Sequence, residues 1–438
     1  MILLRSDIVL RTVLFGCTEF LANKIKLKTE FSIKLLSGNN THSEAMNKTL
    51  YTSAFCVLHS NLYHFPRFVH NISTGDIMTN TTDNVSFFLG ANTPEGFYSL
   101  FSELYSPEDG WRLYIIKGGP GTGKSTLMKR IAAAADRRGQ FSERIYCSSD
   151  PESLDAVIIP SLKISIADGT PPHTLEPKYP GVSEKFVDLG LFRDDSRLDG
   201  HRNEIIETAK ENSFYHKKCV DFLLAALSCR NDTASVVIPS MKIAALHKFS
   251  EKLSEKLLLS VSDAPVKMKK RIISAVTPAG IRDFSDTLGA LSEKRVVLYD
   301  NFGCAAAVIL KFLSLRAAER GIEGYCCYDF MNPSSSPEAL ILPSLNLSLQ
   351  RVKGKPSDTE NGILTVNCMR FYDSSQLSRH KNRLAFNNRS ENEMVSGAVG
   401  GLIKAKATHD RLEKYYISAM DFEKMNDFSE KLIEEIFG

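Results

Sequence analysis

Short apolar stretches alternate with longer segments whose apolar side chains recur at helical spacing, from about residue 85 to the end of the chain. Residues 113–116 form one apolar stretch, and the segment after it carries Leu127, Met128, Ile131 and Ala135 at helical spacing. A strand, a glycine-bearing turn and an amphipathic helix in this order predict an α/β fold with a parallel sheet.

The pattern occurs twice, at a separation of about 180 residues. Four blocks keep their order in both copies: ANTPEG and AVTPAG, IIPSL and ILPSL, FRDDSRLDGHRN and FYDSSQLSRHKN, and a strand-turn-helix segment that ends in Arg-Gly. An internal repeat of this kind indicates duplication of one structural unit. The helical segments 201–260 and 396–437 are expected to pack on the two sheets.

We therefore predict two tandem α/β halves, residues 85–262 and residues 263–438, each with additional helices. Residues 1–84 form an N-terminal extension that has no counterpart in the repeat. Its first 77 residues lack a clear helical or strand period, and Met78 is an alternative start of the protein.

Charge and composition narrow the class of protein. The 54 basic and 51 acidic side chains are spread along the chain, which argues against a nucleic-acid partner or an acidic membrane surface. One tight basic cluster, residues 267–271, is interpreted as a solvated linker. Charged residues interrupt the apolar N-terminal stretch, so neither a membrane span nor an export signal is predicted. Nine cysteines without a CxxC pair fit a reducing cytoplasm.

One motif carries chemistry. Gly118, Gly119, Pro120, Gly121, Thr122, Gly123, Lys124 and Ser125 satisfy the pattern G-x-x-x-x-G-K-[ST] of a P-loop, and Thr126 extends it. The expected strand precedes the motif and the expected helix, residues 125–138, follows it. Backbone N–H groups of such a loop surround phosphate oxygens, Lys124 bridges the β- and γ-phosphates, and Ser125 contributes to a Mg²⁺ site. The motif predicts binding of a nucleoside triphosphate, with ATP as the commoner choice.

Candidates for the remaining roles are acids near strand ends. Asp168 ends an apolar, β-branched stretch and is the candidate metal-binding carboxylate, although Asp-Gly-Thr-Pro-Pro is also an ordinary turn sequence. Asp150 is the rival for positioning metal or water. His173 is expected either to contact a phosphate or to cap the turn that begins at Asp168.

The second half lacks the functional side chains at the matching positions. The repeat aligns Lys124 with Ala306 and Ser125 with Ala307, and it places Asp300 and Phe302 in the loop. Asp168 is aligned with Arg351. We predict that residues 263–438 keep the sheet but do not bind a triphosphate in the usual manner.

Four strings make the chain similar to a family of bacterial proteins with tandem P-loop ATPase-like domains: FFLGANTPEGFYSLF, IIKGGPGTGKSTLMKRIA, CSSDPESLDAVIIPSLKISIADGTPPH and HDRLEKYYISAMDF, the last at residues 409–422. The resemblance extends from about residue 85 to the end. It implies cytoplasmic ATP binding and hydrolysis. In that family the second half often has its own P-loop, so this chain departs from the pattern.

Three functions follow from these residues. The leading hypothesis is a Mg²⁺-dependent ATPase in which Lys124, Asp168 and Asp150 serve the reaction. The alternatives are a kinase that transfers the γ-phosphate to a small molecule or a protein, and a nucleotide-gated binding module without catalysis. The sequence identifies neither the acceptor or partner nor the oligomeric state.

Overall fold

The computed structural model describes residues 85–259, 264–356 and 363–438. The predicted N-terminal extension, residues 1–84, and the alternative start at Met78 lie outside the described residues. Within the described part, no helix is both long and apolar enough to cross a membrane.

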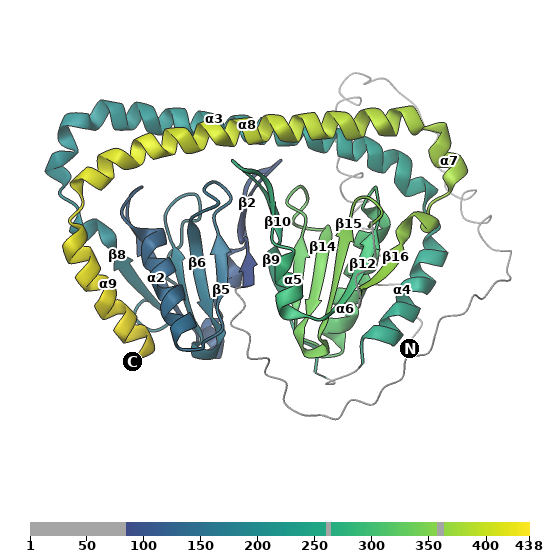
Figure 1. Ribbon diagram of the computed structural model, residues 1–438, viewed down its shortest axis with the longest axis horizontal. Helices are drawn as coiled ribbons and strands as arrows, with labels where there is room; N and C mark the ends of the chain where they lie inside the picture. Colours follow the sequence, from purple (N-terminus) through teal and green to yellow (C-terminus); the bar gives the residue numbers. More distant parts are fainter. Residues whose placement is uncertain (1–84, 260–263, 357–362) are drawn as a thin grey trace, which may run out of the picture. The chain divides into compact units, whose positions relative to one another are not determined.

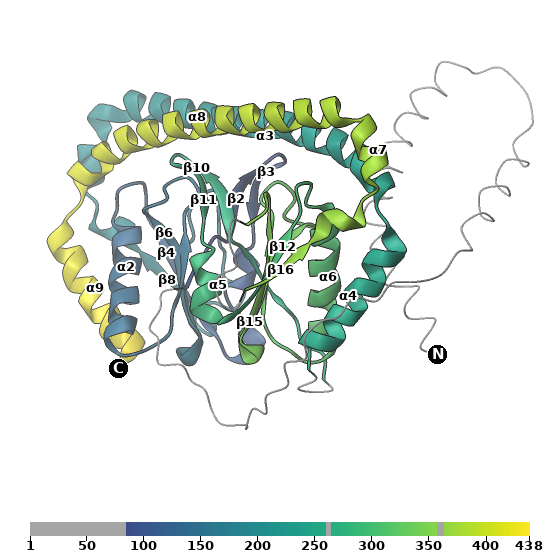
Figure 2. The same cartoon turned by 45° about the vertical axis from the view of Figure 1, so that its right-hand side comes forward.

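The fold is α/β, with two six-stranded sheets that have the same strand arrangement (Figures 1 and 2). The first sheet has the order β1 (Val85–Phe87), β5 (Glu143–Tyr146), β6 (Leu154–Ile159), β7 (Ile164–Asp168), β4 (Arg112–Lys117) and β8 (Glu184–Asp188). The second, read from the other edge, has β9 (Lys269–Ile272), β13 (Tyr325–Tyr328), β14 (Pro337–Leu342), β15 (Leu347–Val352), β12 (Lys294–Tyr299) and β16 (Ile363–Asn367). The strand-by-strand match agrees with the repeat in the sequence.

Each sheet is mixed, which corrects the prediction of parallel sheets. Strand β6 is antiparallel to β5 and β7, and β14 is antiparallel to β13 and β15. The connection from β6 to β7 is a short turn at Pro160–Leu162 followed by Lys163, which is too short for the crossover that parallel neighbours require. The other neighbouring pairs in each sheet are parallel.

The sheets carry short hairpins and helices. The hairpins are β2 (Gly90–Thr93) with β3 (Gly96–Ser99) and β10 (Ser274–Thr277) with β11 (Gly280–Asp283). The helices are α2 (Lys124–Arg137), α3 (Arg202–Val237), α4 (Ile243–Leu257), α5 (Asp286–Leu291), α6 (Cys304–Glu319), α7 (Ser374–Arg379), α8 (Lys381–Ala419) and α9 (Phe422–Phe437). Helix α2 agrees closely with the predicted helix at 125–138.

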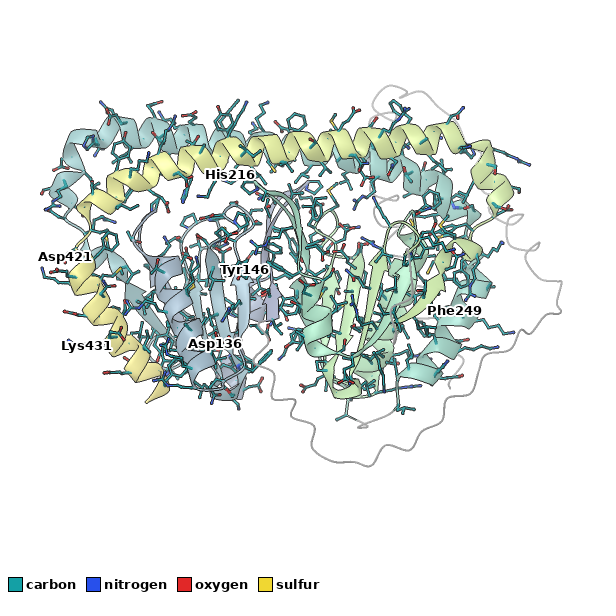
Figure 3. All side chains as sticks on the ribbon, in the orientation of Figure 1. Asp136, Tyr146, His216, Phe249, Asp421 and Lys431 are labelled. Carbon is teal, nitrogen blue, oxygen red and sulfur yellow. The ribbon has the colours of Figure 1, made fainter. Side chains whose placement is uncertain are left out.

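The halves exchange helices. Helix α4 follows the first sheet in sequence but packs against α6 of the second half, where Leu246 and Leu253 join the core. Helix α9 ends the chain but packs against α2 of the first half, where Met425 and Leu432 are buried. Figure 3 labels Asp421 and Lys431 on α9, which lies along the first half, and Phe249 on α4, which lies along the second. Packing therefore crosses the sequence boundary of the repeat.

The long helices α3 and α8 carry the chain from each half to the helix that packs on the other half. They lie side by side and antiparallel, because Asn212 of α3 bonds to Ala405 of α8 whereas Arg230 bonds to Glu391 (Figures 1 and 2). Each begins directly after a histidine, His201 or His380, which are partners in the repeat. Neither histidine side chain makes a capping hydrogen bond to its helix.

The two sheets also meet through a buried ion pair. The Arg271 guanidinium donates two hydrogen bonds to Glu143, at 2.9 and 2.7 Å, and both side chains are almost fully buried. Phe88 and Ile272 exchange backbone hydrogen bonds beside them. The prediction of a solvated linker at 267–271 is therefore wrong for residues 269–271, because Lys269–Ile272 is strand β9 and Arg271 is buried between the halves.

Candidate functional site

The candidate site lies at the loop between β4 and α2, residues 118–123, called the glycine loop below. Gly121 and Gly123 have φ angles of 66° and 86°, in the left-handed region that glycine tolerates best. Gly123 is also the residue before α2, so it has no side chain to accept hydrogen bonds from the first turn of that helix. The positive N-terminal end of α2 thus lacks an acceptor from its own cap residue.

Lys124 folds back over this loop. Its Nζ donates to the carbonyl oxygens of Gly118 at 3.2 Å and Gly119 at 2.8 Å. The same nitrogen lies 3.7 Å from Oδ2 of Asp168, and both side chains are mostly buried. Sequence reasoning singled out both residues, and the fold brings them together because β7 is the parallel neighbour of β4.

Asp168 has two roles at once. Its Oδ1 accepts hydrogen bonds from the backbone N–H of Thr170 at 2.8 Å and from the Thr170 hydroxyl at 2.6 Å, which is the turn geometry expected of Asp-Gly-Thr. Its Oδ2 faces Lys124. The turn interpretation is therefore confirmed, and it leaves one oxygen of Asp168 facing Lys124, while the metal-binding role stays a prediction.

Ser125 and Asp150 contact neighbouring residues at the start of β6. The Ser125 hydroxyl oxygen accepts from the backbone N–H of Leu154 at 3.0 Å. Asp150 accepts from the Ser153 hydroxyl at 2.7 Å, and its other oxygen lies 3.6 Å from Nζ of Lys406 in α8. The structure thus brings Asp168 to Lys124, whereas Asp150 is paired with a residue of α8.

The remaining motif residues shape the loop. Thr122 is buried, and its hydroxyl donates to the carbonyl of Gly119 at 2.9 Å. Pro120 is half-buried, and Thr126 is exposed on the first turn of α2. Thr122 therefore braces the turn, while Thr126 faces solvent.

His173 is buried in an aromatic setting. Its ring stacks on Phe101 with centroids 4.5 Å apart, and its Nε2 lies 3.5 Å from Oδ2 of Asp155. Burial opposes protonation, but the Asp155 carboxylate outweighs it and raises the pKa of His173. Among the described residues, its Nδ1 has no hydrogen-bond partner. The His173 ring is thus held by Phe101 and Asp155, and its contact with a phosphate stays a prediction.

The corresponding loop of the second half, residues 300–303, is shorter. Six residues separate β4 from α2, whereas four separate β12 from α6. When the two halves are aligned at the first residue of each helix, Lys124 corresponds to Cys304 and Ser125 to Ala305. These positions lie two residues before Ala306 and Ala307, which the sequence repeat aligns with them. The cation and the hydroxyl are absent in either alignment.

Asp300 fills this second loop with an internal anion. Its fully buried carboxylate accepts from the N–H of Phe302 at 3.0 Å and the N–H of Ala306 at 2.9 Å. The Tyr372 hydroxyl donates to the same carboxylate and accepts from the N–H of Ala305 at 2.8 Å. The first N–H groups of α6 are thus satisfied within the chain.

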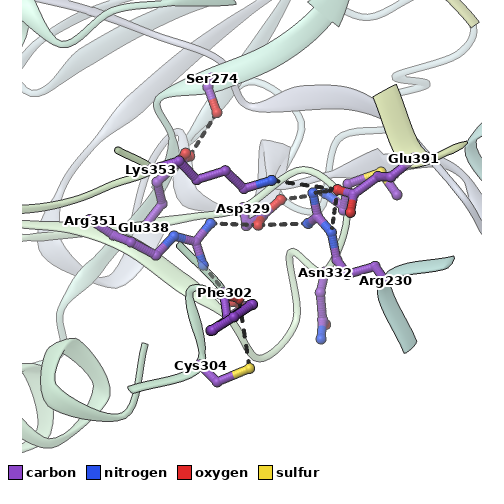
Figure 4. A network of polar contacts seen from close by, with 12 residues as sticks. Arg230, Ser274, Phe302, Cys304, Asp329, Asn332, Glu338, Arg351, Lys353 and Glu391 are labelled. Carbon is purple, nitrogen blue, oxygen red and sulfur yellow. Dashed lines mark hydrogen bonds and ion pairs between the residues drawn. The ribbon is translucent and has the colours of Figure 1, made fainter. Parts of the chain in front are cut away.

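Arg351, the residue that the repeat aligns with Asp168, is bonded within the second half. It bonds to Asp329 at 2.6 Å, and a side chain on Gly303 would meet its guanidinium at 3.1 Å. Arg230 of α3 bonds to the same Asp329 at 2.9 Å (Figure 4). The hydrogen bonds of Arg351 therefore lie within the second half.

Sequence reasoning missed the residues that cover the glycine loop. Glu413, Tyr416 and Ile417 near the end of α8, with Met425 of α9, lie against the glycines of the loop. Arg193, in the segment after β8, lies beside Gly119 and over the Tyr416 ring. The string HDRLEKYYISAMDF contains several of these residues, but nothing in it indicates which loop it contacts.

A scan against family models and searches of curated proteins and solved structures found no match.

Among residues 85–259, 264–356 and 363–438, no three or more His, Cys, Asp or Glu side chains are grouped to hold a metal ion. A Mg²⁺ ion held mainly by phosphate oxygens needs only one or two protein ligands, so this finding does not bear on the predicted pair Ser125 and Asp168.

Proposed function

We propose that the first half binds Mg-ATP at the glycine loop and hydrolyses it, and that the second half has no nucleotide site. The observation that carries the proposal is the position of Lys124. Its ammonium group lies between loop carbonyls and Asp168 at the start of a helix whose cap residue has no side chain. A strand, a glycine loop and this lysine together are the parts that hold triphosphates.

The chain's own residues would act mainly by positioning and charge. Lys124 would exchange the carbonyls of Gly118 and Gly119 for β- and γ-phosphate oxygens, and loop N–H groups would bind the same oxygens. Asp168 and the Ser125 hydroxyl would hold Mg²⁺, which neutralises phosphate charge when it is bound. Oδ1 of Asp168 accepts both hydrogen bonds from Thr170, so Oδ2 is available for this role.

The test compares the wild-type chain with Lys124→Ala and the control Lys129→Ala, which removes an exposed lysine from the same helix. Binding is followed with a fluorescent ATP analogue and turnover by phosphate release. Losing Lys124 should remove measurable binding, because its bonds to the β- and γ-phosphates are each worth about 1.5–3 kcal/mol, whereas Lys129→Ala should bind normally.

The same experiment separates the three functions. Phosphate release by the purified chain supports the ATPase. Binding without release, followed by phosphate transfer when cell extract supplies an acceptor, supports the kinase. Binding with neither reaction supports the nucleotide-gated module. Equal affinity of the wild type and Lys124→Ala for the analogue would overturn the proposal.

A further inference from the structure

The end of α8 lies directly on the glycine loop. A side chain at Gly119 would meet the Tyr416 ring at 3.0 Å, and one at Gly121 would meet Ile417 at 2.8 Å and the backbone carbonyl of Glu413 at 3.0 Å. These glycines thus let α8 approach the loop, in addition to giving it its backbone conformation. Helix α8 begins in the second half, so residues from one half cover the candidate site of the other.

An anion of α8 occupies one of the loop's N–H groups. Glu413 accepts a hydrogen bond from the backbone N–H of Gly121 at 3.2 Å. His409, 3.4 Å away on the previous turn of α8, contributes most to lowering the pKa of Glu413, and the Gly121 N–H adds to it. The carboxylate is therefore charged at neutral pH, and it holds a donor that a phosphate would use.

The second half offers the comparison. There the internal anion is Asp300, fully buried and bound by two N–H groups and a hydroxyl. Glu413 makes a single bond to its loop, its side chain is 31% exposed, and it comes from a separate helix. An acceptor held by one partly exposed bond is displaced far more easily than a buried one with three. The anion at the first loop therefore has fewer bonds to its loop and is more exposed than the anion in the second.

We propose that Glu413 is an autoinhibitory latch, which nucleotide phosphate displaces when it binds the glycine loop. Two anions cannot share the Gly121 N–H, so phosphate entry forces the carboxylate away. Because the backbone of α8 touches Gly121, the end of α8 near residues 409–420 moves with it. This inference rests on the proposed nucleotide site and names its regulation.

The far part of α8 is anchored in the second half. Glu391 accepts from Arg230 of α3 at 2.9 and 2.6 Å, and Lys353 lies 3.8 Å from it (Figure 4). Arg230 also joins Asp329, which binds Arg351. One continuous helix therefore links the glycine loop to the charge network of the second half. When nucleotide displaces Glu413, the resulting movement of α8 is transmitted to the second half.

The test uses the full chain with Glu413→Gln, which keeps the size of the side chain and removes its charge. Glu393→Gln is the matched control, since it removes an exposed carboxylate from the same helix away from the loop. Glu413→Gln should bind Mg-ATP about tenfold more tightly than the wild type, or about 1.4 kcal/mol, and Glu393→Gln should match the wild type. In the wild type, Mg-ATP should speed backbone hydrogen exchange in residues 409–420.

The outcomes separate the latch from the site. Unchanged or weaker affinity in Glu413→Gln, while Lys124→Ala abolishes binding, overturns the latch and leaves the nucleotide site standing. Nucleotide-induced protection of residues 409–420 contradicts the latch in the same way. Binding that survives Lys124→Ala, or no binding by any variant, overturns the nucleotide site itself.

Discussion

Replacing Asp300 by Asn tests whether the second loop is held by an internal anion. The carboxylate is fully buried and accepts hydrogen bonds from Phe302, Ala306 and Tyr372. Asparagine has the same size but offers one oxygen, and its NH₂ group would face a donor. Losing one hydrogen bond to a charged acceptor costs about 1.5–3 kcal/mol, and losing the charge at the start of α6 adds up to about 2 kcal/mol.

We therefore expect Asp300→Asn to lower the free energy of unfolding by about 2–5 kcal/mol. Urea unfolding should be followed by far-UV circular dichroism, because the single tryptophan, Trp111, lies in the first half. The control is Asp283→Asn, an exposed aspartate that accepts from Ser285 in a similar turn and whose loss should move the midpoint little. An unchanged or higher midpoint for Asp300→Asn would refute the reasoning, since the cost of burying the charge would then match its hydrogen bonds.

Two further predictions concern buried charges. Glu143→Gln leaves the Arg271 charge uncompensated between the sheets and weakens the acceptor for the Tyr325 hydroxyl. The free energy of unfolding in urea should therefore fall by about 3–5 kcal/mol. A fall of less than about 1 kcal/mol, the size expected for an exposed ion pair, would contradict this prediction. Burial raises the pKa of Glu338 to about 7, so the folded state holds this proton more tightly than the unfolded state. Stability from this group is therefore present below the unfolded pKa and is lost as pH rises towards 7. Glu338→Gln should stabilise the protein more at pH 8 than at pH 5 in the same unfolding assay, and the reverse order would refute this.

Local patterns in the sequence predicted the parts that depend on local structure. The apolar stretch at 113–116, the glycine loop and the stripe along 125–138 correspond to β4, the loop and α2. The repeat predicted two α/β halves, and the two sheets have matching strand orders. Each of these features is determined by neighbouring residues and by their period.

The prediction of parallel sheets was wrong for β6 and β14, because an apolar strand reads the same in either direction. The signal for an antiparallel β6 was the short link at Pro160–Leu162, which cannot hold a crossover. Helix exchange was missed for a similar reason. The period of residues 243–257 and 422–437 shows which face is buried but not which sheet buries it.

Long-range partners were also beyond the sequence. Arg271 lies in a run of basic residues that is typical of solvated segments, and its partner Glu143 is distant in the chain. Glu413 lies in the string HDRLEKYYISAMDF, but nothing in that string indicates its contact with Gly121, which depends on the path of a long helix. The site residues found by motif are those that share one local segment, and the ones missed come from elsewhere in the fold.

The most direct test of the account is the number of nucleotides bound per chain, measured by titration calorimetry with Mg-ATP. The account predicts one site in the wild type and none in Lys124→Ala, because the second loop is filled by Asp300 and lacks a lysine. Two sites in the wild type, or one that persists in Lys124→Ala, would contradict it.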